Sequence, residues 1–192
     1  MISHQHQKHL VENQFYQILL TDLNQKTFQI HQLKMVHADP HPGNFLISKE
    51  GELMIIDFGC VKKIPDEFYL PYFELADPAL LQNDARFTEK LYQLEVLRQD
   101  DSEQEVAFFK SMFLDLLELF TKPLRSVVFD FTDQRYFDSL AEMGEKYAKK
   151  TELRKMNGNR GSRHFIYMNR TFFGLYHLMN ELGAHNISIH KQ

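Results

Sequence analysis

Two short segments carry polar side chains at a spacing that suits phosphoryl transfer. Residues 37–44 read HADPHPGN, in which Asn44 follows Asp39 by five positions, and a second aspartate, Asp57, opens the triplet DFG. Magnesium takes one or two carboxylates from a protein and completes its shell with phosphate and water oxygens. A phosphoryl-transfer site also needs a group that positions or deprotonates the attacking hydroxyl. The two segments therefore predict a Mg-nucleotide site with Asp39, Asn44 and Asp57 as its candidate residues.

The order of these segments matches the pattern H-x-D-x-x-x-x-N on a loop, followed by D-F-G after a hairpin, which is typical of protein-kinase-like sites. Two short apolar runs, FLI at 45–47 and LMII at 53–56, lie between the motifs. A turn sequence that contains Gly51 separates them. This arrangement predicts a β-hairpin over residues 45–56. Such a hairpin would return Asp57 to the neighbourhood of Asn44.

The elements on either side are expected to be helical. Over residues 8–34 apolar side chains recur at spacings of three, four or seven, which is typical of an amphipathic helix. Downstream of Pro65 the same periodicity predicts helices over 66–81, 83–99, 102–120, 132–150 and 162–182.

Capping signals support these boundaries. Ser102 followed by Glu105 resembles a capping box, Pro123 follows the end of the helix that this box starts, and Gly183 is a natural C-terminal stop. Residues 157–161 form the clearest loop of the second half. The helical remainder thus extends over residues 66–184.

Composition limits the class of protein. The chain has 192 residues, of which 43% are hydrophobic, and we expect it to form a single domain that is mainly α with one small β-hairpin. Its net charge is −4, with lysines and arginines scattered among acids, so no nucleic-acid partner is expected. The single cysteine, Cys60, excludes an internal disulfide and a four-cysteine zinc site. The sequence has neither a secretory signal nor a long apolar run, which favours a cytoplasmic protein.

The string HADPHPGN at 37–44 followed by IDFG at 56–59 resembles the AarF/UbiB family, the aarF-domain-containing atypical kinases associated with ubiquinone biosynthesis. Residues 170–184 also resemble the last helix of that family. The resemblance implies the C-terminal lobe of a protein-kinase-like α+β fold. It also implies a kinase or ATPase that supports quinone biosynthesis, with a peripheral membrane contact or a contact to the lipid and quinone pathway.

The resemblance implies roles for the candidate residues. Asp39 takes the catalytic-loop position as base or orienter, and Asn44 and Asp57 hold Mg²⁺ on the phosphates of ATP. From the residues themselves, His37 and His41 are interpreted as hydrogen-bonding residues that shape the loop.

For Arg163 and Arg170 we expect a place on a helix surface or in an ion pair, with a phosphate contact as the alternative.

A complete kinase fold also has an N-terminal lobe with a glycine-rich loop and a strand lysine. No glycine precedes Gly43, the lysines upstream of the loop lie in helix-like context, and the family's K-x-G-Q signature is missing. We therefore expect the N-lobe to be absent from this chain and to come from a separate chain or an upstream domain.

Two alternatives stay open. One is a small-molecule phosphotransferase of the aminoglycoside or choline kinase type, because those proteins share H-x-D-x-x-x-x-N and a following metal aspartate. The other is a non-catalytic module that keeps the fold and binds a partner. Replacing Asp57 distinguishes them, since a pure scaffold would not respond to the loss of this side chain.

Overall fold

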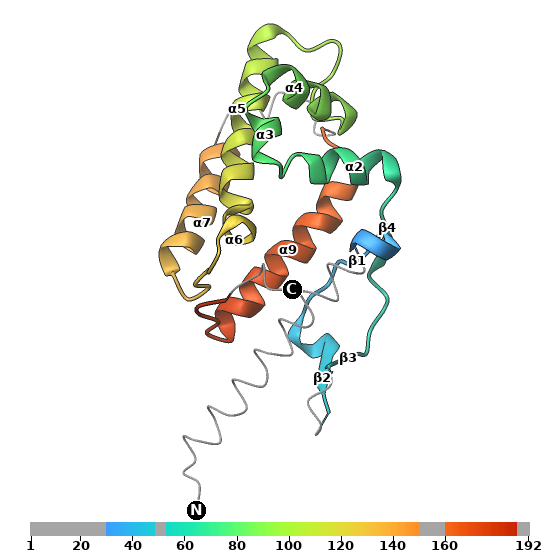
Figure 1. The fold of residues 1–192 in the computed structure, drawn as a ribbon, viewed down its shortest axis with the longest axis vertical. Helices are drawn as coiled ribbons and strands as arrows, with labels where there is room; N and C mark the ends of the chain where they lie inside the picture. Colours follow the sequence, from blue (N-terminus) through green and yellow to red (C-terminus); the bar gives the residue numbers. More distant parts are fainter. Residues whose placement is uncertain (1–29, 49–52, 150–159, 188–192) are drawn as a thin grey trace, which may run out of the picture. The chain divides into compact units, whose positions relative to one another are not determined.

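The computed structural model describes residues 30–48, 53–149 and 160–187, which group into two compact units. Unit 1 contains the residues up to Ile64 together with 129–132 and the segment from Ile166 onward. Unit 2 contains residues 65–128 and 133–165. The described residues are mainly helical, as predicted, and also form two small antiparallel sheets, one of which is the predicted hairpin (Figure 1). No helix in the described ranges is long and apolar enough to cross a membrane.

The predicted hairpin is present in unit 1. Strands β2 (Phe45–Ile47) and β3 (Leu53–Ile55) pair antiparallel, with Leu46 opposite Met54. The predicted turn at Gly51 lies outside the described residues. The prediction of a hairpin over residues 45–56 is therefore confirmed for its two strands.

A second two-stranded sheet was not predicted. Strand β1 (Met35–His37) pairs antiparallel with β4 (Val61–Lys63), and His37 lies opposite Val61. The chain thus leaves β1, passes through the loop 38–44 and enters β2, then returns through β3 and the DFG segment into β4. Because β1 pairs with β4 and β2 pairs with β3, the two motif segments lie opposite each other between two ladders. The β1–β4 pairing, which was not predicted, therefore brings the loop 38–44 and the DFG segment together.

Helix α9 (His164–Glu181) contributes a row of buried side chains to the core of unit 1. Its buried side chains include Met168, Leu175 and Tyr176, and the Tyr176 ring lies 5.6 Å from the ring of Phe131. The predicted stop at Gly183 is confirmed, since this residue has a φ of 68°. The prediction of a helix over 162–182 is confirmed to within two residues at each end.

The secondary-structure elements that the structure describes in unit 2 are all helices, joined by loops (Figure 1). Its elements are α2 (Asp66–Glu74), α3 (Pro78–Leu81), α4 (Asp84–Gln93), α5 (Glu103–Phe120), α6 (Lys122–Arg125) and α7 (Gln134–Ala148). The predicted helix 66–81 is interrupted because Asp77 precedes Pro78, which disfavours the helical backbone. Asp77 instead caps α3 and accepts a hydrogen bond from the Ala79 N–H. The predicted helix 83–99 ends early, at Gln93, and Glu95 has a φ of 61°.

The capping box predicted at the start of α5 is confirmed, because the Ser102 hydroxyl accepts from the Glu105 N–H and the Glu105 side chain accepts from the Ser102 N–H. Helix α5 ends at Phe120, and Pro123 lies in the short helix α6 that follows. Of the predicted helix 8–34, the structure describes residues 30–34, of which 30–33 are helical. The rest of that helix and most of the predicted loop 157–161 lie outside the described residues.

Candidate functional site

Asn44 connects the loop to the hairpin through both its side chain and its backbone. Its amide nitrogen donates to the Asp39 main-chain oxygen and to Asp39 Oδ2, each at 3.0 Å. Its own carbonyl accepts from the Ile56 N–H at 3.0 Å. The amide nitrogen is therefore committed to Asp39, and the amide oxygen is the part of the group that can serve as a neutral, hard ligand.

Asp57 belongs to the segment directly opposite this loop. Its Oδ1 accepts from the Gly59 N–H at 2.7 Å, which fixes the carboxylate within the DFG turn. Its main-chain oxygen accepts from Nε2 of His37 at 2.5 Å. His37 is buried, with 3% of its surface exposed, whereas Asp57 is exposed. The DFG segment is thus tied to the start of the loop by a buried histidine, while its carboxylate faces solvent.

This hydrogen bond requires His37 to carry its proton on Nε2. The other ring nitrogen, Nδ1, is buried and has no hydrogen-bond partner among the described residues. His37 therefore acts as a hydrogen-bond donor that shapes the loop, as expected from the sequence.

His41 shapes the loop from its other side. Its Nδ1 accepts from the Gly43 N–H at 3.1 Å, and its carbonyl accepts from the Asn44 N–H at 2.9 Å. These bonds cap the single 3₁₀ turn Pro42–Asn44. Pro42 and Gly43 are the first two residues of this turn, which places Asn44 directly before strand β2.

Helix α9 supports the loop from beneath at three neighbouring positions. The Thr171 hydroxyl lies 3.2 Å from the His37 carbonyl and 2.9 Å from the Tyr167 carbonyl of its own helix, so its one proton is shared between these two acceptors; Thr171 and His37 are both buried. The backbone of Gly174 lies against Pro40 so closely that an added Cβ would stand 2.1 Å from the proline Cγ. Arg170 Nη2 lies 3.5 Å from Asp39 Oδ1.

The ion pair of Arg170 with Asp39 agrees with one of the roles expected for this arginine. Its partner could not have been found from the sequence, because 131 positions separate the two residues. The structure thus brings Asp39 and Asn44 into direct contact and places Asp57 on the facing segment. A direct hydrogen bond between Asp57 and either of the other two side chains is not among the recorded contacts of the described residues.

The donor set of this region fits magnesium in kind. It comprises carboxylate oxygens and a neutral amide oxygen, which are the hard ligands that Mg²⁺ prefers. Within the described ranges, no group of three or more His, Cys, Asp or Glu side chains could hold a metal by itself. A Mg²⁺ ion that is shared with phosphates needs fewer protein ligands, so the pair Asn44 and Asp57 meets its requirement.

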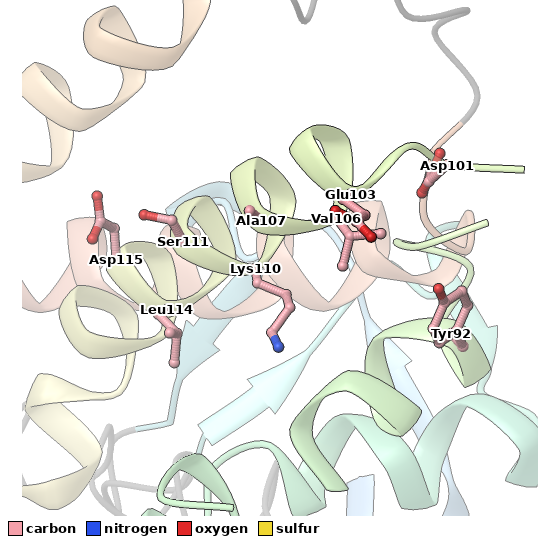
Figure 2. A pocket seen from close by; sticks show the side chains of 9 residues that line it. All are labelled: Tyr92, Asp101, Glu103, Val106, Ala107, Lys110, Ser111, Leu114 and Asp115. Carbon is pink, nitrogen blue, oxygen red and sulfur yellow. The ribbon is translucent and has the colours of Figure 1, made fainter. Parts of the chain in front are cut away.

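A depression in unit 2, with a volume of about 680 Å³, follows one side of α5 and is lined by none of these candidate residues (Figure 2). Three of its charged groups, Asp101, Lys110 and Asp115, have partners. Lys110 pairs with Asp84 at 2.5 Å, and the hydrogen bonds from Lys146 and Tyr147 hold the pKa of Asp115 below its usual range. The ionic groups of this depression therefore contribute to helix packing in unit 2.

Comparison with known proteins gives a match over the segment that holds both motifs. Residues 3–91 match the family model of the ABC1 atypical kinase-like domain, a range that includes both motifs. The Arabidopsis thaliana protein named "Protein ACTIVITY OF BC1 COMPLEX KINASE 3, chloroplastic" is 44% identical over 39 residues. That alignment covers 20% of this chain and 6% of the length of the relative. The resemblance of residues 170–184 to the family's last helix lies outside the matched range and stays a prediction. Both findings support the family expected from the two motifs: residues 3–91 of this chain are similar to the ABC1, or AarF/UbiB-type, atypical kinase-like domain.

Proposed function

We propose that residues 37–59 are the metal- and phosphate-binding half of an atypical kinase or ATPase site. Asn44 and Asp57 hold Mg²⁺ on the phosphates of ATP, and Asp39 orients or deprotonates the attacking hydroxyl or water. The observation that carries this proposal is the bond network of Asn44, which holds the Asp39 carboxylate with its side chain and the residue before Asp57 with its backbone. One residue thus couples the two motif segments.

The chemistry follows from the positions of these groups. When bound, Mg²⁺ neutralises charge on the phosphates and orients them for in-line attack. Asp57 offers this ion an exposed carboxylate whose orientation is set by the Gly59 N–H. Asp39 is held on Oδ2 by Asn44, and each carboxylate oxygen retains a further lone pair for the attacking group.

We further propose that an N-lobe, from a separate chain or an upstream part of the same protein, completes this site. Such a lobe covers the adenine and contacts the α- and β-phosphates. In support, one face of the hairpin exposes apolar side chains. Leu46 and Met54 are opposite each other and are 49% and 45% exposed, and Ile56, which is 54% exposed, follows two positions after Met54 on the same face. A peripheral membrane location and a contribution to quinone biosynthesis complete the proposal and rest on the family resemblance.

The test is thermal unfolding of the chain with and without Mg-ATP. Ligand at 100 times its dissociation constant stabilises a protein by about 2.7 kcal/mol, which is a shift of roughly 5–11 °C for a domain of this size. We expect this shift in the wild type, with magnesium required, and we expect it to disappear in Asp57→Ala. The matched control is Asp138→Ala, which removes an exposed carboxylate from α7 and should keep the full shift.

Each outcome has a clear meaning. A shift that persists in Asp57→Ala would show that the nucleotide binds elsewhere on the chain. No shift in the wild type would contradict the proposal that this lobe alone holds the metal and phosphates, and would favour the partner-binding module. If the shift depends on Asp57, a screen of small-molecule hydroxyl acceptors then separates a phosphotransferase of the aminoglycoside or choline kinase type from an ATPase.

A further inference from the structure

Arg170 contacts the candidate catalytic carboxylate from a helix that is remote in sequence. We propose that Arg170 is a positioning residue that, together with Asn44, fixes the orientation of the Asp39 carboxylate for phosphoryl transfer. This inference rests on the proposed function above and adds to it a residue outside both motifs.

The two contacts hold opposite oxygens of one carboxylate. Arg170 Nη2 lies 3.5 Å from Oδ1, and Asn44 Nδ2 lies 3.0 Å from Oδ2. Donors on both sides restrict rotation of the carboxylate about its Cβ–Cγ bond, which otherwise has a broad torsional minimum. A group that must receive a proton from an attacking hydroxyl benefits from this restriction, because misplacement by about 1 Å costs on the order of a hundredfold in rate.

The packing of α9 explains why Arg170 reaches this position. The adjacent Thr171 is bound to the His37 carbonyl, and Gly174, one turn further along the helix, lies against Pro40. Both contacts hold the loop on the helix and are buried or closely packed, so the position of Arg170 beside Asp39 is set by its neighbours. The loop from Ala38 to Asn44 contains no lysine or arginine of its own. Arg170 therefore brings to Asp39 the positive charge that the loop lacks.

The exposure of the pair distinguishes positioning from stabilisation. The Arg170 side chain is 60% exposed and that of Asp39 is 39% exposed. Ion pairs at such exposure contribute little to folding stability. We therefore expect Arg170→Gln to leave the unfolding midpoint nearly unchanged, as does the control Arg163→Gln, which removes an exposed arginine immediately before α9.

The first measurement needs no enzymatic activity. The ¹⁵N–¹H signals of the Arg170 guanidinium, assigned through their loss in Arg170→Lys, should change in Asp39→Asn and remain in place in Asp138→Ala. Unchanged signals in Asp39→Asn would mean that Arg170 does not hold Asp39, and would overturn the proposal.

The second measurement is Mg-dependent ATP turnover by the chain, supplied with its N-lobe if the chain alone is inactive. Arg170→Gln should lower kcat by roughly ten- to a hundredfold while KM for Mg-ATP stays the same. Arg170→Lys should recover part of the loss, because lysine keeps the charge without the planar fork. Equal kcat values for Arg170→Gln and Arg163→Gln would refute the positioning role. If the wild type neither binds Mg-ATP nor turns it over, the proposed function fails, and the guanidinium signals still decide whether Arg170 holds Asp39.

Discussion

The close approach of Gly174 to Pro40 gives a sharp test of how α9 supports the loop 38–44. A methyl group at Gly174 would meet three atoms of the proline ring, at 2.1, 3.0 and 3.3 Å. Real Cβ contacts below 3.0 Å are essentially never observed, and ordinary contact begins near 3.4 Å. Pro40 is buried, and its ring has no flexible end that could turn aside. Gly174→Ala therefore forces the helix and the loop apart by about 1 Å or more.

The magnitude follows from two opposing effects. Replacing glycine by alanine inside a helix stabilises it by about 0.5–1 kcal/mol. Inserting a methyl group into a closely packed contact costs about 1–3 kcal/mol. Gly144 in α7 is the matched control, because a Cβ added there meets no atom within 4 Å. We expect Gly144→Ala to stabilise the protein. The unfolding free energy of Gly174→Ala should be lower than that of Gly144→Ala by about 1–3 kcal/mol.

The assay is urea unfolding of the two variants and the wild type, in which the unfolding free energies of the variants are compared at equal slope. Gly174→Ala should also break the Arg170–Asp39 contact. The two atoms are already 3.5 Å apart, so any further separation of α9 from the loop takes them beyond hydrogen-bond distance. Equal stabilisation by alanine at the two glycines would refute the reasoning, since the Pro40 contact would then not constrain α9.

Two further predictions concern unit 2. Ser102→Ala removes the capping box of α5 and should cost about 1 kcal/mol in unfolding free energy, whereas Ser111→Ala at an exposed position within the same helix should cost nothing. Arg160→Gln breaks a two-fold hydrogen-bonded pair with Asp101, whose side chain is 2% exposed, and should destabilise the protein by about 3–5 kcal/mol at neutral pH. The hydrogen bond from Arg160 lowers the pKa of Asp101 below 3.8, so this stabilisation is complete above the unfolded pKa and is lost as the pH falls through the lower, folded value. Urea unfolding of Arg160→Gln at pH 7 and near pH 3 should therefore show a smaller deficit at the lower pH, and an equal deficit at both would contradict the assignment.

The parts of the fold that sequence reasoning predicted are those encoded locally. The hairpin 45–56 and the long helices follow from apolar spacing, and the box at Ser102 from two residues three positions apart. The break between α2 and α3 also has a local signal, Asp77 before Pro78, although the periodicity on either side suggested a continuous helix. The candidate residues were found because their motif spacing is itself local.

Strands β1 and β4 could not be predicted for the opposite reason. Each has three residues, as β2 and β3 do, but no short turn sequence joins β1 to β4, and β4 contains Lys62 and Lys63, which are depleted in strands. Their pairing is decided by tertiary contacts, among them the bond from the Ala38 N–H to the Cys60 carbonyl. The contact of Arg170 with Asp39 is similar, since nothing near Arg170 in the sequence indicates its partner.

These non-local contacts change how the motif is understood. The loop 38–44 is held by the β1–β4 ladder at its start, by the β2–β3 ladder at its end and by α9 beneath Pro40. Its side chains determine which chemistry is available, but the angle of the Asp39 carboxylate depends on a helix more than a hundred residues further along the chain. If residues 37–59 act as proposed, a substitution of Arg170 that leaves both motifs intact should change the rate of phosphoryl transfer more than the affinity for magnesium, because Arg170 contacts Asp39, whereas Asn44 and Asp57 are the proposed ligands of the ion. The same geometry implies that unit 1 must retain its strands and its last helix together for the site to form.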